Sequence, residues 1–449
     1  MLHALLKKAF IFIKNYKMNI PTTQQPRLVI IGGGFGGISL AKHLFHKDIQ
    51  IVMLDKRNYH TFQPLLYQVS TSGLEPDSIA YPIRKILNKS KNAYFRLAEV
   101  EAIHPEKKEV ETSIGNLSYD YLVIATGSKT NFFGNATIEA NAVWMKSVPQ
   151  ALNLRSLILE NFEQATITED PKRRKALLNF VVAGAGPTGV ELSGALAELK
   201  NHIIVKDYQD LSPDEIQVHL LEGESRVLPP MSEKASRAAE KFLKELGVHV
   251  HTNTFVENYE NYKVTTNCGK EFYTETFIWS AGVKGASIEG ICGEDLMQRG
   301  NRYKVNRFNQ IEGFDTIFAV GDIACMETEE FPDGHPMVAQ PAIQQGKHLA
   351  KNLLLLIDGK PMKEFTYFDK GTMATIGRNK AVVDLGKLRF GGFFAWFIWM
   401  FVHLWFLVGF RNRVVTFFNW VYNYINYDKA ARLILRPFKA KKLEMNDVE

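Results

Sequence analysis

Two glycine-rich segments are the strongest candidates for chemistry in this sequence. Residues 32–37 read GGGFGG and residues 184–189 read GAGPTG, so both carry glycines at the G-x-G-x-x-G spacing. In such a motif the first glycine permits a tight turn, the second lets the backbone approach a pyrophosphate, and the third lets the following helix pack on its strand. The phosphates then lie at a helix N-terminus, where free N–H groups favour negative charge. The sequence therefore predicts two dinucleotide sites.

An acidic residue follows each motif at the point where a ribose would bind. Asp55 lies 18 residues beyond Gly37, at the end of an apolar run, and Glu222 ends the corresponding run after the second motif. A carboxylate there accepts hydrogen bonds from ribose hydroxyls and repels a 2′-phosphate, which favours NADH over NADPH at the second site. Glu224 strengthens this preference, and Arg226 slightly offsets it.

The elements needed to position these residues occur twice. Around each motif a strand, a glycine turn, a helix and a second strand follow one another, which is the start of a βαβ unit. The expected strands are residues 27–31, 49–54, 119–124, 179–183, 216–221, 276–279 and 316–320, and the expected helices are residues 36–45 and 190–199. A charged insertion at residues 202–215 interrupts the second unit. The pattern predicts an α/β fold with two Rossmann-like domains.

Composition limits the class of protein. The chain has 449 residues, of which 46% are apolar and 23% are charged, as in a globular protein with two or three domains. Cys268, Cys292 and Cys325 form no C-x-x-C motif. Their spacing argues against a disulfide reductase and against a disulfide framework, and it fits a reducing compartment. We expect no metal site and see no nucleic-acid-binding motif.

The C-terminal region differs from the rest of the chain. Residues 386–449 carry ten Lys or Arg against four Asp or Glu, and residues 393–410 form an aromatic, apolar run whose one ionisable residue is His403. That run has a marginal length for a membrane span. Beyond it, apolar side chains recur on one helical face, at Val414, Phe417, Phe418, Val421 and Ile425. We expect two helices lying in the membrane interface, with a single span or a soluble dimer interface as alternatives.

Further motifs occur in the order found in one flavoprotein family. They are residues 55–60 (DKRNYH), 62–68 (FQPLLYQ), 125–127 (ATG), 279–282 (WSAG), 318–322 (FAVGD) and 339–344 (AQPAIQ). The last of them matches an A-Q-x-A-x-Q signature. From about Arg27 to about Arg436 the chain resembles type II NADH:quinone oxidoreductases, which are single-subunit NADH dehydrogenases that do not pump protons.

The resemblance implies a glutathione-reductase-like fold that binds FAD non-covalently and takes NADH as a substrate. The implied FAD contacts are Gly32, Gly34, Phe35, Gly36, Gly37, Asp55, Lys56, Thr61, Phe62, Val100, Ala125, Thr126, Gly127, Asp322, Ala339, Gln340 and His403. The implied NADH contacts are Gly184, Gly186, Pro187, Thr188, Gly189, Glu222 and Gly282. Asp322 would hold the ribityl chain. His403 stands near a position where some members carry a flavin-contacting lysine, and a core histidine is the alternative.

Three residues receive catalytic roles from the same resemblance. Gln340 and Gln344 would position the quinone or the flavin ring, and Glu191 would handle protons near both. From its position alone, shortly after the second glycine motif, Glu191 could equally complement the dipole at a helix N-terminus.

The implied activity is FAD-dependent oxidation of NADH with two-electron transfer to a membrane quinone, menaquinone or ubiquinone, without proton pumping. The resemblance also implies a homodimer. Because family members are monotopic, it implies peripheral binding to the cytoplasmic face of the inner or plasma membrane. Three alternatives remain: a sulfide:quinone oxidoreductase, which needs redox cysteines, a soluble ferredoxin-type reductase, which would lack the aromatic tail, and an NADH-binding redox sensor.

These assignments divide the chain into five segments. The FAD-binding domain comprises residues 27–145 and 284–385, the NADH-binding domain comprises residues 146–283, and residues 386–449 form the membrane-anchoring helices. The leader, residues 1–26, lacks the features of a signal peptide, and its role is open.

Overall fold

The computed structural model describes residues 18–291, 293, 296–426 and 431–435, which divide into two compact units. The first unit comprises the described parts of Met1–His60, Tyr81–Lys129 and Val283–Asp369, and the second comprises those of Thr61–Ala80, Thr130–Gly282 and Lys370–Glu449. Most of the predicted leader, Cys292 and the end of the predicted tail lie outside the described residues.

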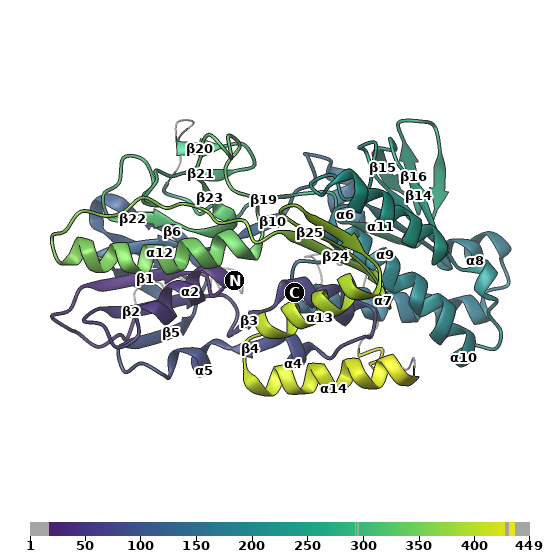
Figure 1. The fold of residues 1–449 in the computed structure, drawn as a ribbon, viewed down its shortest axis with the longest axis horizontal. Coiled ribbons are helices and arrows are strands. Elements are labelled where there is room, and N and C mark those ends of the chain that lie inside the picture. The colour runs from purple at the N-terminus through teal and green to yellow at the C-terminus, as the bar shows by residue number, and fades with distance from the viewer. Residues whose placement is uncertain (1–17, 292, 294–295, 427–430, 436–449) are drawn as a thin grey trace, which may run out of the picture. The chain divides into compact units, whose positions relative to one another are not determined.

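A parallel sheet with the strand order β22-β9-β1-β2-β5 forms the centre of the first unit. Its strands are β1 (Arg27–Ile31), β2 (Gln50–Asp55), β5 (Ala93–Leu97), β9 (Tyr121–Ile124) and β22 (Ile317–Ala319). The central strand β1 is apolar and almost wholly buried, as expected for a strand covered on both faces. Helix α2 (Phe35–His43) begins within the first glycine motif and packs along α12 (Ala339–Ile357) (Figure 1).

Smaller elements complete the first unit. An antiparallel sheet contains β6 (Val100–His104), β7 (Glu109–Thr112) and β8 (Gly115–Ser118), and a mixed sheet contains β20 (Met297–Gln298), β21 (Arg302–Lys304) and β23 (Ala324–Cys325). The others are α5 (Ile83–Leu87), η2 (Pro105–Lys107), β19 (Val283–Gly285) and η6 (Gly321–Ile323). The chain crosses the boundary between the units within β3 (Tyr59–Thr61), β4 (Ala80–Pro82) and β10 (Ser128–Thr130).

The second unit repeats the central arrangement. Its parallel sheet has the order β11-β18-β12-β13-β14 and consists of β11 (Val143–Trp144), β12 (Asn179–Ala183), β13 (Gln217–Leu221), β14 (Val248–His251) and β18 (Thr276–Trp279). Helix α9 (Pro187–Leu199) starts in the second glycine motif, with Pro187 at its first position, where a missing N–H costs nothing. The predicted duplication and the α/β fold class are therefore confirmed.

Further helices and a small sheet belong to the second unit. The helical elements are η1 (Gln63–Leu65), α3 (Leu66–Ser70), α4 (Pro76–Ile79), α6 (Ala136–Asn141), α7 (Val148–Ile167), α8 (Pro171–Leu177), η3 (Lys200–Ile204), α10 (Val205–Asp207), η4 (Pro213–Glu215) and α11 (Glu233–Glu245). An antiparallel sheet contains β15 (Val256–Glu260), β16 (Lys263–Thr266) and β17 (Glu271–Tyr273). The predicted insertion at residues 202–215 begins as helix, because the π-helical turn η3 directly continues α9.

The C-terminal part of the second unit is an antiparallel sheet followed by two helices. The sheet consists of β24 (Thr372–Gly377), β25 (Lys380–Leu385) and β26 (Leu388–Gly391), and the helices are α13 (Phe393–Phe406) and α14 (Phe410–Asn426) (Figure 1). Within the described ranges, no helix is both long and apolar enough to cross a membrane.

The structural division differs from the predicted domain boundaries at three places. Residues 61–80, 130–145 and 370–385, which the sequence boundaries gave to the FAD-binding domain, cluster with the second unit. Residues 130–145 include β11, which pairs with β18 of the second sheet. The reason is packing, since α3 contacts α7 and α9, and α9 lies against β24.

Gly194 provides a test of this packing. A Cβ at this position of α9 would lie 1.7 Å from the carbonyl oxygen of Ile376 in β24. Alanine normally stabilises a helix by about 1 kcal/mol relative to glycine. We expect Gly194→Ala to do the opposite and to lower the free energy of unfolding by about 3 kcal/mol or more, because backbone must move. Thermal unfolding measures the effect.

Ser193→Ala is the matched control. The Ser193 hydroxyl is buried and has no hydrogen-bond partner among the described residues. Its removal should leave Tm unchanged or raise it. A Gly194→Ala protein as stable as the parent would contradict the close approach of α9 to β24.

Candidate active site

The first glycine turn is closed to side chains at two positions and open at one. Gly32 has φ +108°, and a Cβ there would lie 2.3 Å from the carbonyl oxygen of Ala125. A Cβ at Gly37 would lie 2.0 Å from the carbonyl oxygen of Gly32. At Gly34, by contrast, the nearest atom would be 4.0 Å away. The open side is the one that a pyrophosphate needs.

Asp55 holds this turn in place. The Gly33 N–H donates to Asp55 Oδ2 at 2.7 Å, and the Arg57 N–H donates to Oδ1 at 2.7 Å. Burial raises the pKa of the Asp55 carboxyl, and these two hydrogen bonds oppose that rise. Each carboxylate oxygen keeps a second lone pair, so Asp55 can fix the turn and still accept a ribose hydroxyl.

His60 is a second support for the turn that the sequence did not single out. Its Nδ1 lies 2.9 Å from the Gly33 carbonyl oxygen, to which it donates, and its ring meets Phe35 edge-on at 5.0 Å. Burial lowers the pKa of His60 to about 4, so the ring is neutral at pH 7. The only sequence signal was its place in the DKRNYH segment.

Asp322 is positioned by two hydrogen bonds within the first unit. The Ser128 hydroxyl donates to Asp322 Oδ2 at 2.5 Å, and Gln345 Oε1 accepts the N–H of Gly321 at 2.7 Å. Gly321 has φ +78°, so the turn that presents Asp322 requires glycine. Gln345 was missed because the A-Q-x-A-x-Q signature draws attention to Gln340 and Gln344.

The Gln344 side chain is hydrogen-bonded to Phe368 and not to the turn that presents Asp322. Its amide exchanges two hydrogen bonds with the backbone of Phe368, with Nε2 to O at 2.9 Å and N to Oε1 at 3.1 Å. Gln340 lies half-buried in the first turn of α12, beside Ala339.

The remaining predicted FAD contacts are divided between the units. In the first unit, Lys56 pairs with Glu99 at 3.6 Å, Val100 begins β6, Gly36 faces Val320, and Ala125, Thr126 and Gly127 follow β9. The Thr126 hydroxyl is buried without a hydrogen-bond partner in the described structure, as expected of a group awaiting a ligand. Thr61, Phe62 and His403 belong to the second unit. The open turn, the two held carboxylates and the orphaned hydroxyl fit FAD.

The second glycine turn has the same construction. Gly184 has φ +96°, and a Cβ there would lie 2.5 Å from Ala281 Cα, whereas a Cβ at Gly186 would meet nothing within 4 Å. Glu222 accepts the Ala185 N–H on Oε2 at 2.6 Å and the Glu224 N–H on Oε1 at 3.0 Å. Glu222 therefore does in this turn what Asp55 does in the first one. The structure brings together Pro187, Thr188 and Gly189 at the start of α9.

Aromatic side chains surround the carboxyl edge of the second sheet. Gly282 has φ +158°, and a Cβ there would meet the ring of Phe133, which is 63% exposed. Phe255 follows β14 next to the Glu222 turn, with its ring 3.7 Å from where a Gly223 Cβ would be, and is 55% exposed. Sequence reasoning missed both residues, because nothing in a single strand pattern places them beside a neighbouring turn.

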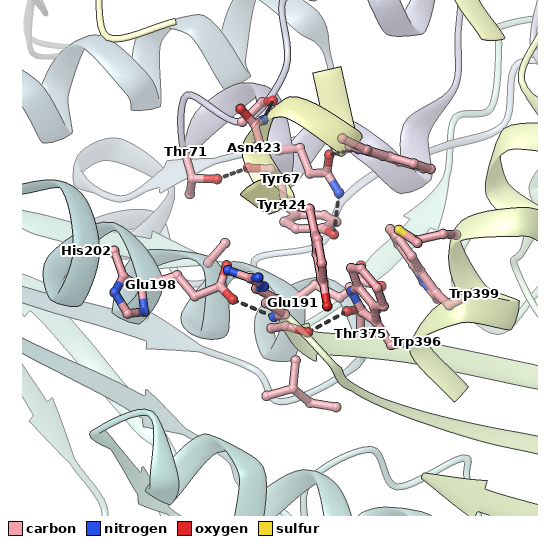
Figure 2. Close-up of a pocket in the computed structure, with 18 of the residues that line it drawn as sticks. Tyr67, Thr71, Glu191, Glu198, His202, Thr375, Trp396, Trp399, Asn423 and Tyr424 are labelled. Atoms are coloured by element: carbon pink, nitrogen blue, oxygen red, sulfur yellow. Dashed lines mark hydrogen bonds between the residues drawn. The ribbon is translucent and has the colours of Figure 1, made fainter. Parts of the chain in front are cut away.

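The second unit contains a cavity lined by α3, α9, the β24–β25 turn, α13 and α14, with room of about 130 Å³ for water-sized molecules (Figure 2). Its aromatic walls come from Trp396, Trp399, Trp420 and Tyr424. Glu191 lies in this cavity together with Tyr67, Glu198 and His202 (Figure 2). A carboxyl enclosed by aromatic side chains can have a shifted pKa that suits it to proton transfer, unlike a carboxyl on the surface.

Glu191 is buried and protonated at neutral pH. Burial raises the pKa of its carboxyl to about 8, against hydrogen bonding from the Thr375 N–H at 3.5 Å and from Trp399. The Trp399 interaction is weak, since the indole Nε1 makes no hydrogen bond of normal geometry within the described structure. Helix α9 begins at Pro187 and has no acidic residue in its first turn, so complementing the helix dipole does not explain Glu191.

His403 lies between two aromatic side chains. It stacks on Trp399 with ring centroids 4.1 Å apart and meets Phe62 edge-on at 6.1 Å. Its Nδ1 donates to the Trp399 carbonyl oxygen at 2.7 Å, which leaves Nε2 as an acceptor in the neutral ring. Burial lowers the pKa of His403 to about 4.

Two protein-family profiles match the chain. Residues 26–346 match the pyridine nucleotide-disulphide oxidoreductase family, and residues 370–426 match the NDH2 C-terminal domain. Among solved structures, NDH2 from Plasmodium falciparum in complex with NADH is similar, with a TM-score of 0.83, 20% identity, and coverage of 92% of this chain and 100% of that one. The sulfide:quinone oxidoreductase of Aquifex aeolicus has a TM-score of 0.69 at 22% identity, covering 86% and 92%. At these identities both show the fold alone.

Curated relatives carry the closer likeness. The type II NADH:quinone oxidoreductase Ndh of Mycobacterium tuberculosis is 36% identical over 427 residues, which cover 90% of each chain. The type II NADH:quinone oxidoreductase of Haemophilus influenzae is 30% identical over 404 residues, covering 81% of this chain and 88% of that one. Since this likeness extends over nearly the whole chain and the C-terminal profile matches the same family, the protein belongs to the type II NADH:quinone oxidoreductases.

Proposed function

We propose that this protein oxidises NADH and passes two electrons to a membrane quinone, with FAD as its bound cofactor and without pumping protons. The observation that carries the proposal is a buried Glu191, whose pKa burial raises to about 8, on the helix that begins at the second glycine turn, in a chamber walled by the aromatic C-terminal helices. Purified flavoprotein should oxidise NADH with a soluble quinone analogue and should not do so without an acceptor.

The two glycine turns take different dinucleotides in this proposal. The first turn, with Asp55 and Asp322, would hold FAD, and the second, with Glu222, would bind NADH. Bound FAD supplies the two-electron redox chemistry that joins NADH oxidation to quinone reduction. The chain itself orients the nucleotides through its backbone N–H groups and carboxylates, and Glu191 holds a proton at its carboxyl until the reduced quinone takes it. Gln340 would help to position the ring system.

The rival reading as a sulfide:quinone oxidoreductase requires a redox-active cysteine pair. Of the cysteines that the structure describes, Cys268 is exposed in the second unit and Cys325 is buried in the first, and both are free. The described cysteines therefore give no support to that rival.

The position of Glu222 predicts the preference for NADH. Its carboxylate would repel a 2′-phosphate and accept the ribose hydroxyl of NADH. We expect Glu222→Gln to lower kcat/KM for NADH by about tenfold and to raise the ratio of NADPH to NADH activity, because one acceptor and the negative charge are lost. Steady-state kinetics with both nucleotides measure this, and an unchanged ratio would remove Glu222 from nucleotide selection.

Glu191 predicts a pH dependence. A carboxyl with a pKa of about 8 carries its proton below that pH and loses it above, so quinone reduction should decline as the pH rises through about 8. Glu191→Gln cannot donate a proton. We expect this variant to reduce quinone about tenfold or more slowly, to lose the decline near pH 8, and to retain FAD with an unaltered absorbance spectrum. Full activity in Glu191→Gln would contradict the role of Glu191 as a proton donor.

We also propose that α13 and α14 bind the protein to a membrane surface. Large apolar side chains are exposed on both helices: Phe393, Phe394, Phe397, Phe401, Trp405 and Phe406 on α13, and Phe410, Val414, Phe417, Phe418, Val421, Tyr422 and Ile425 on α14. Helix α14 has its polar side inward, where Asn412 Nδ2 donates to the carbonyl oxygens of Asp77 at 2.9 Å and Ala80 at 3.1 Å. A helix that buries amides and exposes phenylalanines suits a lipid interface.

Basic residues accompany the exposed aromatics. The Arg413 guanidinium lies 6.0 Å from the Trp405 ring, and the Lys370 ammonium lies 5.9 Å from the Phe406 ring. Such pairs are typical of the lipid headgroup region, where aromatic rings enter the lipid and cations contact lipid phosphates. We further infer the cytoplasmic face of the membrane and a homodimer, on the strength of the family alone. Light scattering of the purified protein tests the dimer.

The membrane proposal predicts a loss of vesicle binding. Replacing Phe417 and Phe418 by Glu should weaken co-sedimentation with phosphatidylglycerol vesicles by about tenfold or more, because apolar area is lost and charge repulsion is added. Tyr273→Glu is the control, since Tyr273 is 56% exposed on a different part of the same unit and should leave binding unchanged. Equal binding by all three proteins would refute α14 as the membrane face.

A further inference from the structure

Four side chains of the cavity lie along one face of α9 and its π-helical continuation. Glu191, Ala195, Glu198 and His202 are spaced by four, three and four residues, which places them above one another on a helix surface. All four line the same cavity, and Figure 2 shows Glu191, Glu198 and His202 from this face. Ala195 is small, so it leaves the space between the two carboxyls open. The proposed function uses Glu191 and gives no role to the other polar residues.

The first half of this row is buried and the second half is partly exposed. Glu191 is 8% exposed, whereas Glu198 and His202 are partly exposed. The cavity volume of about 130 Å³ is enough for several water molecules. Titratable groups therefore lead from the partly exposed end of this row to a buried carboxyl.

Tyr67 on α3 lines the same cavity as the two carboxyls. Its phenol is buried, and its pKa is raised well above 10, first by burial and then by the charges of Glu191 and Glu198. Its oxygen accepts a hydrogen bond from Gln68 Nε2 at 2.8 Å, so its own O–H is a donor into the cavity. A hydroxyl that both donates and accepts is suited to pass a proton between acids.

Charged and polar groups from every wall face this row. Besides Tyr67 on α3, they include Arg378 at the β24–β25 turn, Trp399 on α13 and Tyr424 on α14. The Arg378 backbone N–H donates to Glu198 Oε1 at 2.5 Å, and the Arg378 guanidinium stacks on Tyr424, 3.9 Å from the ring centroid. Glu198 is thus held in one orientation by backbone.

We propose that His202, Glu198 and Tyr67, with cavity water, carry protons from solvent to Glu191. The inference rests on the proposed quinone reductase activity. In that reaction NADH, one proton and quinone give NAD⁺ and quinol, so each turnover takes one proton from solvent while NADH supplies the hydride. Glu191 gives its proton to a quinone oxygen. It regains one through the Tyr67 hydroxyl or water, Glu198 supplies that one, and His202 recharges Glu198 from solvent.

Glu198→Gln tests the relay. Glutamine keeps an oxygen that accepts the Arg378 N–H, and it removes the proton-carrying group. We expect kcat with a soluble quinone to fall about tenfold or more, with a larger solvent deuterium isotope effect, because proton resupply becomes limiting. NADH oxidation by ferricyanide, which takes electrons but no protons, should stay within about twofold of the parent. Glu198→Asp should restore most of the quinone activity.

Glu245→Gln is the matched control. Glu245 is an exposed carboxylate on α11 that binds the same hairpin, through Lys380 Nζ at 2.5 Å, and it does not line the cavity. It should change neither activity. A second relay variant, His202→Gln, should slow quinone reduction mainly at high pH, where external protons are scarce.

Two outcomes would overturn the relay. One is a Glu198→Gln protein with the parent's quinone turnover and isotope effect. The other is an equal loss with quinone and ferricyanide, which would place the defect in the fold or in NADH oxidation. If the parent itself reduces ferricyanide but no quinone, the proposed function fails instead.

Discussion

The structure depends on one interaction that occurs twice: a partly buried carboxylate that holds a glycine turn by its backbone N–H groups. Asp55 does this for Gly33, and Glu222 does it for Ala185. The glycine at the start of each turn has no Cβ to collide with the backbone that follows the neighbouring strand. A turn with few side chains, however, has few contacts that hold its conformation. The carboxylate supplies that fixation. It also ends the strand beside the turn, so sheet, turn and ribose acceptor are placed by one group.

A carboxyl that accepts few hydrogen bonds behaves differently from one that accepts several. Asp55 and Glu222 accept N–H donors on both oxygens, whereas Glu191 has the Thr375 N–H at 3.5 Å and a weak contact with Trp399. With so little to stabilise the anion in a desolvated chamber, the neutral acid is favoured. Asp55 and Glu222 thus each hold a turn through two backbone donors, whereas burial raises the pKa of Glu191 with few donors to oppose it, which suits the proton-carrying role proposed for it.

Sequence reasoning was most successful where backbone geometry restricts residue type. Gly32 and Gly184 adopt positive φ and leave no space for a Cβ, so the motif itself carries the information. Sequence reasoning was less informative where tertiary packing determines which side chain faces a site. The signature in α12 favoured Gln344, but the packing of α12 on α2 turns Gln345 inward to hold Gly321. Residues 202–215 were expected to be an insertion that interrupts the second βαβ unit, yet their beginning continues α9 and brings His202 into line with Glu191. No local pattern indicates either outcome.

Helix α14 links the proposed membrane face to the chamber around Glu191. Its Trp420 indole donates to Gln68 Oε1 at 2.8 Å, and the other end of the same amide donates to the Tyr67 hydroxyl. The helix whose outer side carries Phe417 and Phe418 thereby sets the orientation of a phenol in the chamber, and its Tyr424 forms part of the wall. If α14 were displaced, the chamber would open further to solvent and Gln68 would lose the hydrogen bond from Trp420. Both glycine turns would stay intact. Such a protein would keep the two turns proposed to bind the nucleotides but would lose the enclosed surroundings of Glu191, so quinone reduction would depend on α14 staying in place.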